Sequence, residues 1–120
     1  MYTSDGKVSA VLDWEMAALG DPCIDLAWGI AIDDCNSKGV HVDRLSGFPG
    51  PVATIAKWEA LTGFSAENFD YYYILALYKF TVIMVKVVRK LEHYEMMPLG
   101  MNAHINNHVT PMLEAKLKEL

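Results

Sequence analysis

Apolar residues recur at helical spacing in four stretches of the chain, and turn-forming residues separate these stretches. The pattern predicts four helices: Pro22 to about Asp34, Pro51 to Leu61, about Ala66 to His93, and about Met101 to Leu120. Asp21 is a good N-cap for the first helix, and Pro22 suits the first helical position. Gly63 follows the second helix, where glycine commonly ends a helix. The chain is therefore expected to be mainly helical.

The third of these stretches is the most apolar part of the chain, because residues 71 to 88 are nearly all hydrophobic. Lys79 and Lys86 interrupt it, and a lysine at the middle of a bilayer is costly. We therefore expect a central helix that is buried in protein and covered by helices on both sides, with Ile83 in the core. The alternative interpretation is a small membrane protein, and this interpretation depends on residues 71 to 88 alone.

The first 20 residues have a different pattern. Asp5-Gly6 is a strong hairpin-turn signal, and it would join a strand ending near Thr3 to the apolar run Val8–Leu12. This predicts a short N-terminal β-hairpin ahead of the helices. The run stops at Asp13, which suits a magnesium ion, since Mg²⁺ usually takes one or two carboxylates plus substrate phosphates. An aspartate that only caps a turn is the simpler alternative.

Composition and charge narrow the possible partners. Hydrophobic residues make up 52% of the 120 residues and the mean hydropathy is +0.15, which favours a piece that packs against something else. The net charge of −5 argues against a nucleic-acid partner. Cys23 and Cys35 form no metal or redox motif. A reduced, cytoplasmic setting is therefore expected.

Three spaced motifs carry a resemblance to a known family: Leu12-Asp13-Trp14-Glu15, then Gly20-Asp21-Pro22, then Asp25-Leu26-Ala27. With them the chain resembles the aminoglycoside phosphotransferase family, kinase-like enzymes that phosphorylate small molecules. It is most similar to the branch whose members occur alone in bacteria or fused to acyl-CoA dehydrogenases. The resemblance is dense from Gly6 to Trp28 and faint to about Leu91.

The resemblance implies that residues 1–120 are the C-terminal portion of a kinase-like phosphotransferase domain, α+β when intact. The intact enzyme would move a phosphoryl group from ATP to a small-molecule hydroxyl with Mg²⁺. Asp13 would do the work of the kinase DFG aspartate and hold Mg²⁺, and Leu12 would lie against the adenine. Glu15 and Asp21 would be second-shell or acceptor-side groups, and Asp25 would bond back to the catalytic loop. Without the family, Asp25 is simply a carboxylate at a helix start.

The family's catalytic loop, a His-x-Asp followed by an Asn, is expected just upstream of residue 1, together with the Gly-rich hairpin and the ATP-holding lysine. The catalytic aspartate would therefore come from outside this chain, and the chain alone is expected to be inactive. Its partners would be the missing N-terminal part of the domain and a hydroxyl acceptor, without a membrane. The alternative is a non-catalytic helical module that binds a partner or forms a homodimer. The reading frame upstream of Met1 distinguishes the two.

Two other features have simple structural explanations. Asp33, Asp34 and Asp43 make the start of the Gly- and Pro-rich loop at residues 36–51 acidic, as a solvated loop would be, although the loop could form part of an acceptor-site wall. His104 and His108 stand four apart, but a zinc-protease motif needs a glutamate where Ile105 stands. We therefore expect both histidines to cap a helix or to lie on the surface.

Overall fold

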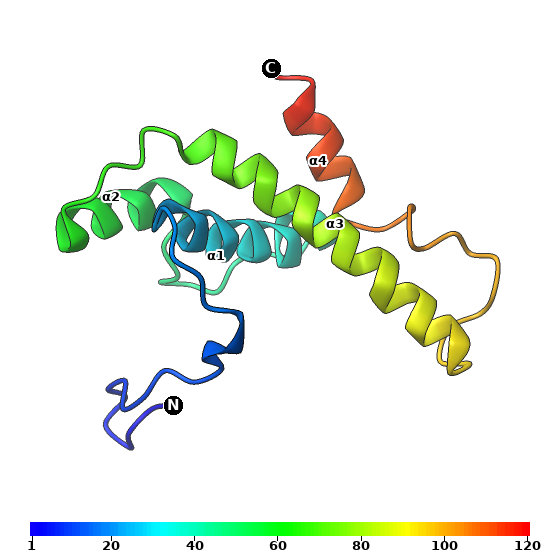
Figure 1. Cartoon of the computed structure of the whole chain (residues 1–120), viewed down its shortest axis with the longest axis horizontal. Coiled ribbons are helices and arrows are strands. Elements are labelled where there is room, and N and C mark those ends of the chain that lie inside the picture. Colours follow the sequence, from blue (N-terminus) through cyan, green and yellow to red (C-terminus); the bar gives the residue numbers. More distant parts are fainter.

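The computed structural model of the protein covers residues 1–120 and describes every side chain except that of Met16. Its four α-helices are α1 (Cys23–Asn36), α2 (Pro51–Thr62), α3 (Phe69–His93) and α4 (Thr110–Leu117), with single 3₁₀ turns at η1 (Trp14–Met16) and η2 (Lys38–Val40) (Figure 1). The prediction of a mainly helical chain with four helices is confirmed. The bounds of α1 and α2 lie within two residues of the predicted ones.

Helix α1 provides much of the core. The Asp21 carboxylate accepts a hydrogen bond of 2.8 Å from the backbone N–H of Cys23, so it caps the helix start as predicted. Along the helix one stripe is buried at helical spacing: Cys23, Leu26, Ala27, Ile30, Ala31, Asp34 and Cys35. Six of these seven residues are apolar or cysteine, and the seventh is the carboxylate Asp34, which therefore needs partners inside the protein.

Helix α3 crosses α1 and buries Tyr73, Ala76 and Leu77 against it. The Trp28 and Phe80 rings meet edge to face with their centroids 6.0 Å apart. Val109, just before α4, is fully buried in the same cluster. Figure 1 shows α3 crossing α1 and continuing well past it. The packing centre is thus the crossing of α1 with the first half of α3.

The second half of α3 differs from the prediction. Ile83, expected in the core, is 42% exposed, and Val82 and Val87 are exposed to a similar degree. The reason is that the last helix begins only at Thr110 and not near Met101, so it lies beside the first half of α3. By length and composition α3 could cross a membrane, and 22% of its most apolar window is buried.

The predicted β-hairpin does not form as a pair of strands. Among the described residues, the pairing there is one antiparallel bridge between Tyr2 and Val8. The turn itself is present, because Gly6 has φ +80° and its N–H donates to the Thr3 carbonyl at 3.0 Å. An isolated two-stranded hairpin is marginally stable in water. Here the hydrogen bonds reach from the turn to Met1, whose carbonyl accepts from the Ser9 N–H at 3.0 Å, but Val8, Val11 and Leu12 stay exposed, so little burial stabilises the pair.

Candidate functional site

Asp13 ends an extended run and adopts a left-handed backbone conformation, with φ 69° and ψ 47°. That conformation is uncommon for a residue other than glycine, although aspartate tolerates it better than most. The turn η1 follows at once, and the Trp14 indole N–H donates to the Val11 carbonyl at 2.9 Å. Three other non-glycine residues in the chain share the left-handed region, so the conformation alone does not mark a site. It does turn the chain sharply at the predicted metal ligand.

The Asp13 carboxylate, the predicted magnesium ligand, is exposed. In the described part of the chain, no three His, Cys, Asp or Glu side chains lie close enough to hold a metal together. Magnesium does not need such a cage, because it is usually bound by one or two carboxylates plus substrate phosphates and water. The single carboxylate of Asp13 is therefore the minimum that a protein contributes to a magnesium site.

The surroundings of Asp13 are apolar and open. Leu12, predicted to lie against adenine, is 62% exposed, and Val11, Trp14 and Leu19 are exposed as well. Single exposed apolar residues are ordinary, whereas a contiguous apolar patch can mark an interaction surface. An adenine site at Leu12 would need a second wall beyond those the described residues provide.

The other predicted site residues are separated by the structure. The second carboxylate oxygen of Asp21 accepts a hydrogen bond from the Tyr72 hydroxyl at 2.9 Å, which ties the start of α1 to α3. Asp21 is thus engaged in holding two helices together. Glu15 and Asp25 are both exposed. The bond predicted from Asp25 to a catalytic loop would involve a segment outside residues 1–120.

An ion-pair network around the buried carboxylate of Asp34 lies at the other end of α1. Asp34 is 4% exposed and accepts a hydrogen bond from the Tyr73 hydroxyl at 2.8 Å. Lys38 Nζ lies 3.0 Å from the same carboxylate, and Arg44 bridges Asp34 and Asp33, with its Nε 2.6 Å from Asp33. Burial opposes ionisation of Asp34, but the bonds from Tyr73, Lys38 and Arg44 outweigh it and lower its pKa. Two carboxylates face two cations, so the network is close to neutral.

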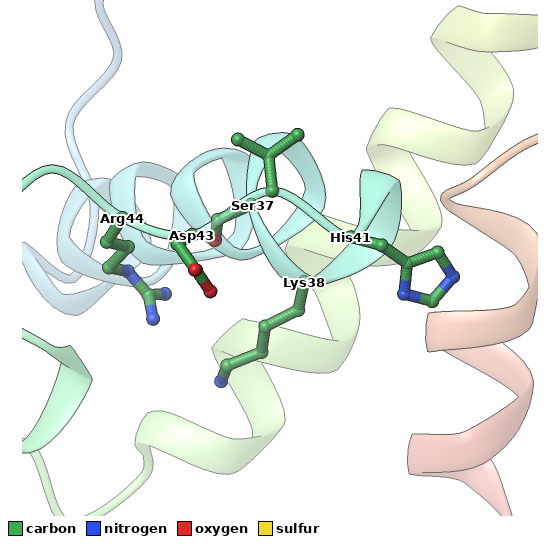
Figure 2. Close-up of a pocket in the computed structure, with 6 residues that line it drawn as sticks. Ser37, Lys38, His41, Asp43 and Arg44 are labelled. Carbon is green, nitrogen blue, oxygen red and sulfur yellow. The ribbon is translucent and has the colours of Figure 1, made fainter.

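This network fastens the loop after α1. The loop borders a hollow of about 500 Å³, lined by Ser37, Lys38, His41, Val42, Asp43 and Arg44. Figure 2 shows the side chains of Lys38, Asp43 and Arg44 projecting from the loop, with His41 directed towards the side of α4. Because Lys38 and Arg44 are already paired with α1, the hollow offers no excess of positive charge. The ion pairs therefore account for the shape of the loop, and they do not indicate a binding site in the hollow.

The interpretation of Asp34 as part of a solvated loop was wrong, because Asp34 is buried in α1. The helical spacing of the apolar residues predicts this burial. Asp34 ends the predicted helix and lies on the stripe of Ala27, Ile30 and Ala31, so the spacing of that helix points it inwards. A buried carboxylate then requires a cation, and Arg44 is close in sequence. The loop also contains His41-Val42-Asp43, which has the His-x-Asp spacing of the family's catalytic loop. Phe48 occupies the position where that loop has its Asn, and the triplet follows Asp13 and does not precede it.

Residues 1–50 match the model of the phosphotransferase enzyme family. The matched residues include Leu12, Asp13, Glu15, Asp21 and Asp25, which are all the predicted site residues. The match ends at the first residue before α2. No curated protein and no solved structure matches the chain. The family match thus supports an origin related to phosphotransferases, and it rests on the N-terminal segment, α1 and the loop that follows α1.

Proposed function

We propose that the chain carries the metal-binding segment of an ATP- and Mg²⁺-dependent small-molecule phosphotransferase, with Asp13 as the magnesium ligand. The observation that carries the proposal is the family match over residues 1–50, which contains a free carboxylate at the end of an extended apolar run.

The residues around Asp13 have distinct roles in this proposal. The bound ion would neutralise charge that develops on the transferred phosphoryl group. Asp13 contributes one ligand oxygen and fixes the ion relative to the chain. Leu12 provides one apolar wall for the adenine, and Glu15 stands beside the metal ligand on the exposed turn. Asp21 acts indirectly by anchoring α1 to Tyr72, which keeps the following helix in place.

The catalytic aspartate and the rest of the nucleotide site come from chain outside residues 1–120 in this proposal. The exposed Val8, Val11, Trp14 and Leu19 support it, since covering them requires a further layer of protein. The chain would then form part of the C-terminal lobe of a kinase-like domain, in the branch related to acyl-CoA dehydrogenase fusions. Both cysteines are free and buried, which fits a reduced cytoplasmic protein. Asp25 would support the catalytic loop from the first turn of α1.

The test is steady-state kinetics on the protein encoded by the whole reading frame. Asp13→Asn keeps the shape of the side chain and removes its charge. We expect kcat to fall by about two orders of magnitude or more, the loss typical of one important electrostatic group. Asp70→Asn is the matched control, because Asp70 is an exposed aspartate outside the matched segment. It should leave kcat unchanged.

The isolated 120-residue chain is a second test. We expect it to show no turnover of ATP with Mg²⁺, since the catalytic aspartate would be missing. Turnover that disappears in Asp13→Ala would mean that the chain contains its own catalytic base. Normal kcat in the Asp13→Asn variant of the whole protein at saturating Mg²⁺ would remove the metal assignment and, with it, the kinase interpretation.

A further inference from the structure

The second half of α3 concentrates positive charge on its exposed side. Residues 71–91 contain no aspartate or glutamate, and they hold four of the chain's ten lysine and arginine residues, namely Lys79, Lys86, Arg89 and Lys90. All four are exposed, and none of them forms an ion pair in the part of the chain that the structure describes. Because the whole chain has a net charge of −5, these four residues form a local cationic patch on an acidic protein.

Aliphatic side chains lie among these cations. Ile83 stands four residues after Lys79 and three before Lys86, so the three side chains are neighbours along one face of the helix. Val82, Ile83 and Val87 are 42%, 42% and 40% exposed. Every exposed residue from 82 to 90 is a lysine, an arginine, a valine or an isoleucine. Over this stretch the face therefore combines charge with apolar surface and offers no neutral polar side chain.

The opposite side of α3 fixes which way this face points. Leu77 and Val88 are buried against the rest of the protein, so the cationic patch is directed towards solvent. Helix α4 lies beside the first half of α3. Figure 1 shows the second half of α3 extending beyond its crossing with α1. An extended surface could therefore contact the whole face at once.

The composition of this face distinguishes between possible partners. A second copy of the chain docked on the same face would place cations against cations, and like charges across an interface oppose binding. Protein-binding surfaces are typically depleted in lysine and enriched in aromatic residues and methionine. Here three of the four cations are lysines, and the exposed apolar residues between them are valine and isoleucine. An anionic lipid surface fits both groups, because its headgroups attract the cations and its acyl boundary accepts the aliphatic side chains.

We propose that the second half of α3 binds the surface of an anionic membrane, with the helix lying along the headgroups. The four cations contact the anionic headgroups, and Ile83 and Val87 reach the acyl boundary. A cluster of four to eight lysines and arginines on an amphipathic helix is typical of binding to anionic lipids. The expectation of no membrane rested on the cost of a lysine at the middle of a bilayer, and a helix on the surface keeps its lysines among the headgroups. The proposal does not depend on phosphotransfer at Asp13.

The test is co-sedimentation of the 120-residue chain with lipid vesicles. We expect binding to vesicles made of equal parts of phosphatidylcholine and phosphatidylserine. Binding to phosphatidylcholine alone should be weaker by about tenfold or more, because each cation near an anionic surface strengthens binding by about fivefold. Binding should also fall steeply as the salt concentration rises to about 0.5 M, since salt screens exposed charges. This salt dependence tests the contacts without any substitution.

Paired substitutions separate the cationic patch from the charge of the chain as a whole. Lys86→Gln combined with Lys90→Gln should weaken binding by about 25-fold, which corresponds to two cations at about fivefold each. Lys57→Gln combined with Lys118→Gln is the matched control, because both lysines are exposed elsewhere in the chain and the net charge changes equally. The control should bind the vesicles as the unchanged chain does.

A further substitution tests the apolar contribution. Ile83→Gln should weaken binding by about fivefold or more, because it removes an aliphatic side chain that the acyl boundary would bury. Val52→Gln is its control, since Val52 is 82% exposed on α2. Circular dichroism confirms that each variant is folded.

Several results would overturn the proposal. These are the absence of vesicle binding, equal binding to both kinds of vesicle, or an equal loss of binding in the lysine control. Binding to polyglutamate without binding to vesicles would indicate an acidic protein partner instead of a membrane. If the protein encoded by the whole reading frame does not bind the vesicles, another part of that protein covers this face and the proposal is wrong.

Discussion

The N-terminal segment, residues 1–19, and the crossing of α1 with α3 are built in opposite ways. In the N-terminal segment every described side chain is exposed apart from Ala10, which is half-buried. At the crossing, Ala27, Ala31, Cys35 and Leu77 are fully buried. The two regions have similarly apolar sequences, so hydrophobicity alone does not separate them. The difference is that the crossing has a partner helix within residues 1–120 and the N-terminal segment has none.

This contrast separates stability from the proposed chemistry. Asp13 and its neighbours contribute little to the packing of residues 1–120, while the helix crossing contributes most of it. The family match nevertheless includes both the N-terminal segment and α1. Substitutions at the crossing should therefore unfold the chain, and substitutions at Asp13 should spare the fold. The predictions below test this separation, beginning with the largest effect.

Leu77→Asp should have the largest effect, because Leu77 is fully buried at the crossing of α1 and α3. An unpaired charge there would have to be neutralised or the chain would unfold. We expect the cooperative thermal transition to be lost. Leu77→Ala should keep the fold but lower the free energy of unfolding by about 2–5 kcal/mol.

Ile83→Asp is the matched control for that substitution. Ile83 lies in the same helix but is 42% exposed, so the new carboxylate can reach water. Its melting temperature should stay close to that of the unchanged chain. A loss of folding as severe as that of Leu77→Asp would show that the second half of α3 is covered in solution.

Asp34→Asn should have the next largest effect, since it removes the charge that Lys38 and Arg44 face. Both cations reach solvent, so the cost should be below that of breaking a fully buried pair. We expect a loss of about 2 kcal/mol, in the range for hydrogen bonds to charged groups. Urea denaturation measures it. Asp33→Asn is the control, because Asp33 is more exposed and should lose less.

The contribution of Asp34 should also depend on pH with a defined sign. Its folded-state pKa lies below the ordinary value of 3.8, so the folded protein holds the charged form more tightly than the unfolded chain does. The stabilisation is therefore fully present above pH 3.8 and is lost as the pH falls through the folded-state pKa. The difference in unfolding free energy between the unchanged chain and Asp34→Asn should shrink over that range. A difference that grows on acidification would contradict the ion-pair network.

The helices were predictable because their signals are local. Asp21 caps α1, and Gly63 ends α2 in the left-handed conformation. Within each of these two helices the apolar residues recur at helical spacing. The start of α4 was not predictable in this way. Residues 101–109 contain apolar residues at plausible helical spacing, but Asn102 has φ 51° and the Asn107 side chain binds the backbone around it. Side-chain bonds to the backbone compete with helix formation, and the apolar pattern does not show them.

The family resemblance could be predicted from the sequence, whereas the geometry around the candidate site residues could not. The motif around Asp13 indicated a family, and the family match over residues 1–50 supports that origin. The surroundings of a metal and adenine site at Asp13 and Leu12 depend on residues far apart in sequence or outside residues 1–120. The same limit applied to Ile83, whose burial depended on where another helix would begin. Tertiary contacts decided both cases, and spacing along one segment does not contain them.

Asp13→Asn should have the smallest effect on stability. The side chain is exposed, and asparagine tolerates the left-handed conformation as aspartate does. We expect the free energy of unfolding to change by less than about 0.5 kcal/mol, as for most surface substitutions. Asp13→Ala should cost about 1 kcal/mol more, because alanine is disfavoured where φ is positive. Urea denaturation of the three chains separates the backbone effect from the charge effect. If Asp13→Asn lowered the free energy of unfolding by more than about 1 kcal/mol, the Asp13 carboxylate would contribute to the stability of the fold. That result would contradict the separation of stability from the proposed chemistry.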